Sequence, residues 1–123
     1  MSDKTKILYV DDEHINLQLF QINFSKKFDV ILAEDGAEGL RQIEKNPDTN
    51  VVISDMKMPN LSGIDFISRA KKKHPNIKYY ILTGFEITPE IKEALERGLI
   101  IKYFSKPFDF HDISLTLDEA TVH

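Results

Sequence analysis

Five short, mostly apolar segments recur along this chain, and a stretch with helical periodicity follows each of them. Runs of four or five such residues are typical of parallel strands that are buried on both faces. Their alternation with helices through short connections predicts one parallel sheet, helices on both of its faces and right-handed crossovers. The predicted strands are residues 7–10, 30–33, 51–54, 79–82 and 100–104.

The helical segments carry their own start and stop signals. A helix is expected over residues 14–26, where apolar side chains recur at i, i+3 and i+7. Another begins at Thr88-Pro89, because threonine caps a helix and proline suits its first turn, and it ends at Gly98. Asp35-Gly36 is a common hairpin signal, but apolar residues at helical spacing follow it, which favours a helix there.

Length and composition limit the function classes. A chain of 123 residues is expected to form one domain. Its net charge of −4 does not favour nucleic-acid binding. It has no cysteine, no signal-peptide pattern and no apolar segment long enough for a membrane span. We therefore expect a cytoplasmic protein that binds neither membranes nor nucleic acid.

Polar residues follow four of the five predicted strands. Because parallel strands end at one edge of the sheet, where open α/β folds bind their ligands, these residues are expected to converge. They are Asp11, Asp12 and Glu13 after the first strand, Asp55 after the third, Thr83 after the fourth and Lys106 after the fifth.

The predicted cluster has the chemistry of a magnesium site beside a phosphoryl group. Asp11, Asp12 and Asp55 offer only hard oxygen ligands, which Mg²⁺ prefers and Mn²⁺ accepts, and the backbone carbonyl of Lys57 could add another. Lys106 could neutralise a phosphoryl oxygen and Thr83 could donate to one. Since aspartate is a competent phosphoryl acceptor, the pattern points to phosphoryl transfer. Alone, however, Asp11-Asp12-Glu13 could merely cap a helix.

In these features the chain resembles the receiver domain of two-component response regulators. The resemblance covers about residues 6–118, which would be the core of the single receiver domain formed by residues 1–123, with no output domain visible. It rests on Asp11-Asp12, on Asp55-Met56-Lys57-Met58-Pro59, and on Gly63, Thr83-Gly84, Tyr103 and Lys106-Pro107. It implies a flavodoxin-like (βα)5 three-layer α/β sandwich with strand order 2-1-3-4-5. The implied function is a phosphorylatable switch of a phosphorelay, a regulatory domain rather than an enzyme.

The resemblance also assigns roles to the residues of the metal site. Asp55 would receive a phosphoryl group from a phosphohistidine of a sensor histidine kinase or phosphotransfer protein. Asp12, Asp55 and the carbonyl of Lys57 would bind Mg²⁺ directly, and Asp11 would act largely through water.

The remaining implied roles concern the response to the phosphoryl group. Thr83 and Lys106 would hold its oxygens, and Tyr103 would follow the movement of Thr83, although an aromatic residue in a strand needs no special role. The Lys106–Pro107 bond would be cis. The face formed by the fourth helix, fifth strand and fifth helix would contact an effector, and a homodimer through it is possible. Lys57 and Phe85 suggest slow hydrolysis of the phosphoryl group.

Two other function classes use similar features. A magnesium-dependent aspartyl-phosphate phosphatase also places aspartates at strand ends, but it typically has a second acid two residues after its nucleophile, where this chain has Lys57. A flavin or nucleotide binder of the same fold would need a glycine-rich loop after the first strand. That place holds three acids instead.

Overall fold

The computed structural model describes residues 4–84 and 87–121, in which five strands alternate with five helices. The strands are β1 (Lys6–Val10), β2 (Asp29–Ala33), β3 (Val51–Asp55), β4 (Lys78–Thr83) and β5 (Lys102–Ser105). The helices are α1 (His14–Phe24), α2 (Gly36–Lys45), α3 (Gly63–Lys73), α4 (Pro89–Glu96) and α5 (Phe110–Thr121). None of the helices in this part of the chain is long and apolar enough to cross a membrane.

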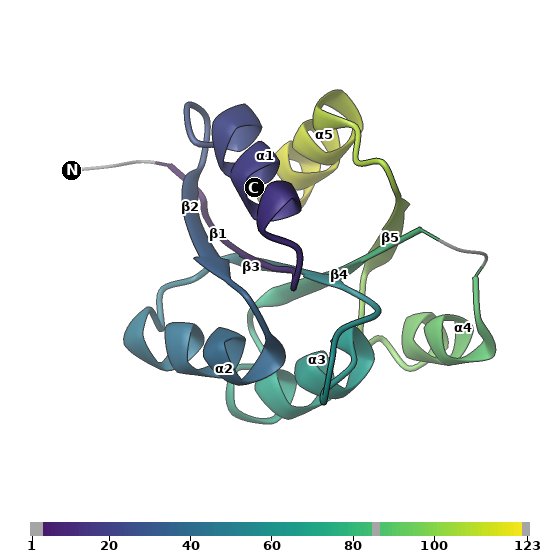
Figure 1. Ribbon diagram of the computed structural model, residues 1–123. Coiled ribbons are helices and arrows are strands. Elements are labelled where there is room, and N and C mark those ends of the chain that lie inside the picture. The colour runs from purple at the N-terminus through teal and green to yellow at the C-terminus, as the bar shows by residue number, and fades with distance from the viewer. Residues whose placement is uncertain (1–3, 85–86, 122–123) are drawn as a thin grey trace.

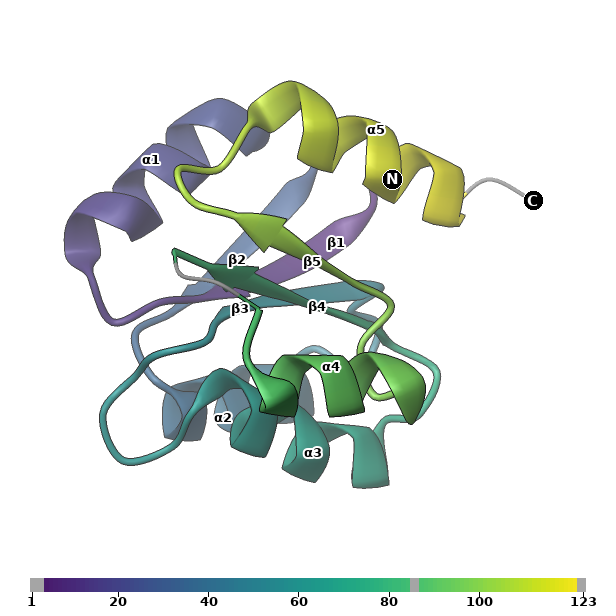
Figure 2. The same cartoon turned by 90° about the vertical axis from the view of Figure 1, so that its right-hand side faces the viewer.

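The five strands form a single parallel sheet in the order β2-β1-β3-β4-β5. At the carboxyl end of β1, Val10 lies opposite Ala33 on one side and Ser54 on the other. Helices α1 and α5 cover one face of the sheet and α2, α3 and α4 cover the other (Figures 1 and 2). The predicted flavodoxin-like (βα)5 sandwich and its strand order are therefore confirmed.

Two apolar clusters fill the spaces between the sheet and its helices. The cluster under α1 and α5 is rich in aromatic rings, with Tyr9 stacked on Phe20 at 4.1 Å between ring centroids and Phe20 stacked on Phe24 at 4.2 Å. The cluster on the opposite face is largely aliphatic and includes Val10, Val52 and Ile81. Strand residues alternate between the two clusters because successive side chains point to opposite faces.

Side chains cap three of the helices in the described structure, and the cap at Thr88 was predicted from the sequence. The side chains of Asp35, Ser62 and Thr88 accept hydrogen bonds from the backbone N–H three residues later, at 2.8, 3.2 and 3.2 Å. Asp35 therefore begins α2 and not a hairpin, as expected. Helix α1 ends at Phe24 rather than at residue 26, with Ser25 as its C-cap. Beyond it the N–H of Lys27 donates to the carbonyl of Phe24, only three residues earlier, at 3.1 Å, which is the bond of a turn.

The predicted fifth strand began two residues too early. Gly98 has a φ of 73°, and after this left-handed turn the N–H of Ile100 donates to the carbonyl of Ala94 at 3.4 Å. Ile100 thus belongs to the closure of α4, although its side chain is buried like that of a strand residue. Ile101 is 54% exposed, and β5 begins at Lys102.

Candidate functional site

The polar residues predicted at the strand ends do converge at one edge of the sheet. Asp11 and Asp12 directly follow β1, Asp55 ends β3, Thr83 ends β4 and Lys106 follows β5. Since β3 pairs with both β1 and β4, Asp55 lies in the middle of this edge. The parallel register alone is sufficient to bring together residues that are far apart in the sequence.

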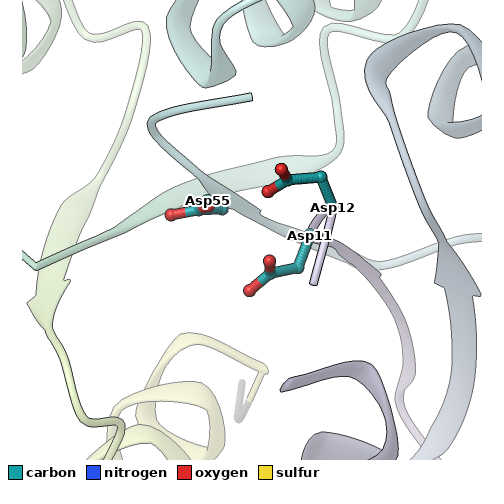
Figure 3. Close-up of side chains that lie close together, drawn as sticks. All are labelled: Asp11, Asp12 and Asp55. Atoms are coloured by element: carbon teal, nitrogen blue, oxygen red, sulfur yellow. The ribbon is translucent and has the colours of Figure 1, made fainter. Parts of the chain in front are cut away.

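Three carboxylates form the centre of the site. Asp11, Asp12 and Asp55 each offer an oxygen, and these atoms all lie within 4.8 Å of one another. Figure 3 shows the side chains of Asp11 and Asp12 extending from the end of β1 beside that of Asp55. Asp11 and Asp55 are buried, whereas Asp12 is more exposed. At this spacing the three charges repel one another, so the cluster favours a cation or a proton.

Lys106 supplies a positive charge to this cluster. Its Nζ lies 2.8 Å from Oδ1 of Asp55, whose exposed fraction is only 4%. Burial raises the pKa of Asp55, and the charges of Asp11 and Asp12 add to that effect, while the Lys106 hydrogen bond opposes it. Burial lowers the pKa of Lys106, but the hydrogen bond and charge of Asp55 outweigh it and the net pKa is raised. Lys106 is therefore a fixed cation.

Three hydrogen bonds hold the carboxylate of Asp11, and two of their donors, Tyr9 and Asn16, had no predicted role. The hydroxyl of Tyr9 donates to Oδ2 of Asp11 at 2.6 Å, and the side-chain amide of Asn16 donates to the same oxygen at 3.2 Å. The backbone N–H of Glu13 donates to Oδ1 at 3.0 Å. Burial, and then the hydrogen bond to Asp11, raise the pKa of Tyr9 above its usual value, so its hydroxyl stays protonated and donates.

A cavity of about 470 Å³ opens beside the carboxylates. Thr83 lines it from the end of β4, and only 3% of its surface is exposed. Gly84 is next to it, and a Cβ at that position would lie 3.5 Å from the side chain of Lys106, an ordinary contact distance. The cavity is lined by Asp12, Glu13, Asp55, Met56, Lys57, Thr83, Gly84, Thr88 and Lys106.

The loop after β3 is shaped by a close approach at Gly63. The N–H of Gly63 donates to the carbonyl of Met56 at 2.9 Å, which closes the loop over the strand end. A Cβ on Gly63 would lie 2.3 Å from the backbone oxygen of Asp55, well below any normal contact. The loop can therefore return this close to Asp55 only because residue 63 has no side chain.

The other predicted residues lie around this centre. The Lys106–Pro107 peptide bond is cis, as expected. Tyr103 does not line the described cavity; it is partly buried on β5 and packs against the aliphatic cluster, one strand away from Ile81. Phe85 lies outside the described residues, so its suggested effect on hydrolysis stays a prediction.

The donor set fits a hard divalent cation. All three side chains are carboxylates, and the described chain brings no nitrogen or sulfur ligand into the cluster. Mg²⁺ is typically bound by one or two carboxylates together with water and phosphate oxygens, which the adjoining cavity has room for. The residues present therefore match the chemistry expected of a magnesium site.

The chain is similar to known proteins over nearly its whole length. The model of the response regulator receiver domain family matches residues 7–118. Sporulation initiation phosphotransferase F of Bacillus subtilis is 34% identical over 110 residues, which cover 88% of this chain and 86% of that protein. The transcriptional regulatory protein ZraR of Escherichia coli is 30% identical over 122 residues, or 98% of this chain, but only 27% of its own length. The chain thus spans about a quarter of the length of such transcriptional relatives.

Solved structures give the same result. A response regulator receiver domain protein from Clostridium thermocellum superimposes with a TM-score of 0.83 at 34% identity, covering 94% of this chain and 93% of that one. The chemotaxis protein CheY4 of Vibrio cholerae has a TM-score of 0.85 at 27% identity, covering 94% and 98% of the two chains. The chain belongs to the response regulator receiver domain family, whose members are phosphorylatable switches of two-component signalling systems.

Proposed function

We propose that Asp55 is the phosphoacceptor of this receiver domain. The observation that carries the assignment is its position: a buried carboxylate at the central strand end, paired with Lys106 at 2.8 Å and beside two further carboxylates. Asp11 and Asp12, together with Asp55 and the carbonyl of Lys57, would hold a Mg²⁺ ion. When bound, that ion neutralises charge on the phosphoryl oxygens.

The transfer would use a phosphohistidine of a histidine kinase or phosphotransfer protein as the donor. One carboxylate oxygen of Asp55 attacks the phosphorus, the bond from phosphorus to the imidazole nitrogen breaks, and the nitrogen takes up a proton. The ammonium of Lys106 and the hydroxyl of Thr83 would stabilise the phosphoryl oxygens, because both residues line the same cavity as Asp55. This makes Asp55 a regulatory acceptor, with no substrate turnover required of the domain.

The switch would run from Thr83 to Tyr103. Ile81 on β4 is the register partner of Tyr103 on β5 and precedes Thr83 by two residues, so Thr83 and Tyr103 belong to adjoining parts of the β4–β5 pair. Tyr103 is only partly buried and packs on the α4 side of the sheet. Movement of Thr83 toward a phosphoryl group would therefore alter the surface formed by α4, β5 and α5, where an effector would bind. A full shift between two states needs about 5.5 kcal/mol of differential stabilisation.

Incubation with acetyl phosphate and Mg²⁺ tests the proposal. Mass spectrometry should find one phosphoryl adduct that hydroxylamine removes, and peptide mapping should place it on Asp55. Asp55→Asn should carry no adduct, whereas Asp29→Asn, the same chemical change at the exposed start of β2, should be labelled like the wild type. Equal labelling of Asp55→Asn would contradict the assignment, and steady release of phosphate without an adduct would favour a phosphatase.

A further inference from the structure

The hydrogen bonds of Asp11 leave its carboxylate little freedom. A carboxylate offers about four acceptor positions, two on each oxygen. Tyr9 and Asn16 both donate to Oδ2, and the backbone N–H of Glu13 donates to Oδ1. The remaining acceptor position is therefore on Oδ1, and the orientation of the carboxylate is fixed before any ion binds.

Tyr9 is the more deeply buried of the two side-chain donors. It is two residues before Asp11, so both side chains point to the same face of β1. Its ring is fully buried and lies parallel to Phe20, with 6° between the ring planes. The 2.6 Å distance from its hydroxyl to Asp11 is short, as expected for a hydrogen bond to an ionised group.

A second buried tyrosine on the same face shows that burial alone does not impose such a contact. Tyr80 on β4 belongs to the same aromatic cluster, is also fully buried and stacks on Phe104 at 5.6 Å. Its hydroxyl has no hydrogen-bond partner within the described part of the chain. The hydroxyl of Tyr9, in contrast, is directed at a residue of the acid cluster.

We propose that Tyr9 is a positioning residue for the divalent cation. By occupying Oδ2 of Asp11, its hydroxyl holds the carboxylate so that Oδ1 is presented to the ion or to a water bound by it. The inference rests on the proposed function of Asp11, Asp12 and Asp55 as the magnesium site. Loss of a hydrogen-bond partner behind a ligand typically weakens metal binding about 10- to 100-fold, because the ligand is no longer held in its binding orientation.

The affinity of Tyr9→Phe for Mn²⁺ and Mg²⁺ tests this inference. Free Mn²⁺ is measured by electron paramagnetic resonance, and Mg²⁺ by its competition with bound Mn²⁺. The variant keeps the stack on Phe20 and loses only the hydroxyl, so about 10-fold weaker binding is expected. Tyr80→Phe is the matched control and should bind like the wild type. An affinity of Tyr9→Phe within about twofold of the wild type would overturn the inference.

A double-mutant cycle separates positioning from packing. In an Asp11→Ala background the hydroxyl of Tyr9 has lost its acceptor, so Tyr9→Phe should weaken Mn²⁺ binding no further. An undiminished loss in that background would mean that Tyr9 acts through packing and would refute the proposal. Asn16→Ala, on the half-buried flank of α1, should give a smaller loss in the same direction. If the wild type itself binds neither ion, the magnesium site is wrong, a result distinct from equal binding by wild type and Tyr9→Phe.

Discussion

Replacement of Asp12 by asparagine should stabilise the fold when no divalent cation is present. Asp12 is one of three carboxylates whose oxygens lie within 4.8 Å of one another. At that distance each repulsion is worth from about 0.9 kcal/mol in water to about 3.5 kcal/mol at an effective dielectric of ~20. Because Asp12 is the most exposed of the three, the lower value is the better guide, and its two repulsions together contribute about 2 kcal/mol.

A smaller opposing effect comes from α1. Asp12 lies just before the N-terminus of that helix, where a negative charge stabilises by about 0.5 kcal/mol. The net gain for Asp12→Asn is therefore about 1.5 kcal/mol, which for a chain of this length raises the melting temperature by about 6 °C. Magnesium should reverse the order. An ion at 100 times its dissociation constant would stabilise the wild type by about 2.7 kcal/mol, and the variant would lack one of the proposed ligands.

Thermal unfolding followed by circular dichroism, with EDTA or with Mg²⁺, measures both effects. Asp29→Asn is the control: it removes the same charge at the opposite edge of the sheet and should change neither melting temperature by more than about 2 °C. If Asp12→Asn melts at or below the wild-type temperature in EDTA, the three carboxylates do not repel as argued. If the variant gains as much from Mg²⁺ as the wild type, Asp12 is not a ligand.

Three further outcomes follow from the geometry. Gly63→Ala should lower the free energy of unfolding, measured in urea, by about 3 kcal/mol, because its Cβ would overlap the backbone oxygen of Asp55. Gly84→Ala, whose Cβ would make only ordinary contacts, should change that free energy by less than about 0.5 kcal/mol. Burial raises the pKa of Asp55 in the folded protein above its value in the unfolded chain. The charge of Asp55 therefore destabilises the metal-free fold as pH rises from the unfolded-state pKa through the folded-state pKa. The free energy of unfolding of Asp55→Asn relative to the wild type should accordingly increase from pH ~4 to pH ~7 in EDTA. Tyr79→Phe should lower the free energy of unfolding by about 1 kcal/mol, since the hydroxyl of Tyr79 donates to the backbone carbonyl of His74 at 2.9 Å. Tyr80→Phe should leave it unchanged, because the hydroxyl of Tyr80 has no partner in the described structure.

The site could be predicted from sequence to the extent that backbone topology determines it. Asp11, Asp55, Thr83 and Lys106 each follow a short apolar run, and a parallel sheet places the ends of such runs at one edge. The signal needs no knowledge of side-chain packing, because any sequence with this alternation brings these positions together. The residue types then limit the chemistry to hard cations and phosphoryl groups.

The contacts of Tyr9 and the place of Ile100 depend on side-chain packing and were not predicted from the sequence pattern. In the sequence Tyr9 is one more apolar residue of a buried strand. In the structure its ring stacks on Phe20, and because Asp11 follows two residues later on the same face of the sheet, its hydroxyl reaches that carboxylate. That two-residue spacing was visible in the sequence and could have suggested the contact. The predicted start of the fifth strand at Ile100 was wrong for a related reason. An apolar residue just before a strand is equally compatible with the strand and with the turn that closes the preceding helix.

The formal charges at the sheet edge indicate how a divalent cation could neutralise this largely buried acid cluster. Three carboxylates and the ammonium of Lys106 leave a charge of minus two, which one divalent cation would neutralise. Phosphorylation of Asp55 would then make a nearly neutral site negative, since a phosphoryl group adds charge of about −1.5 to −2 while one carboxylate charge is lost. Besides the ammonium of Lys106, the hydroxyl of Thr83 lines the same cavity and could respond to this charge. A bound divalent cation would therefore have two effects on the proposed switch. It would neutralise the resting site, and the charge added by phosphorylation would then act on the hydroxyl of Thr83 as an unbalanced negative charge.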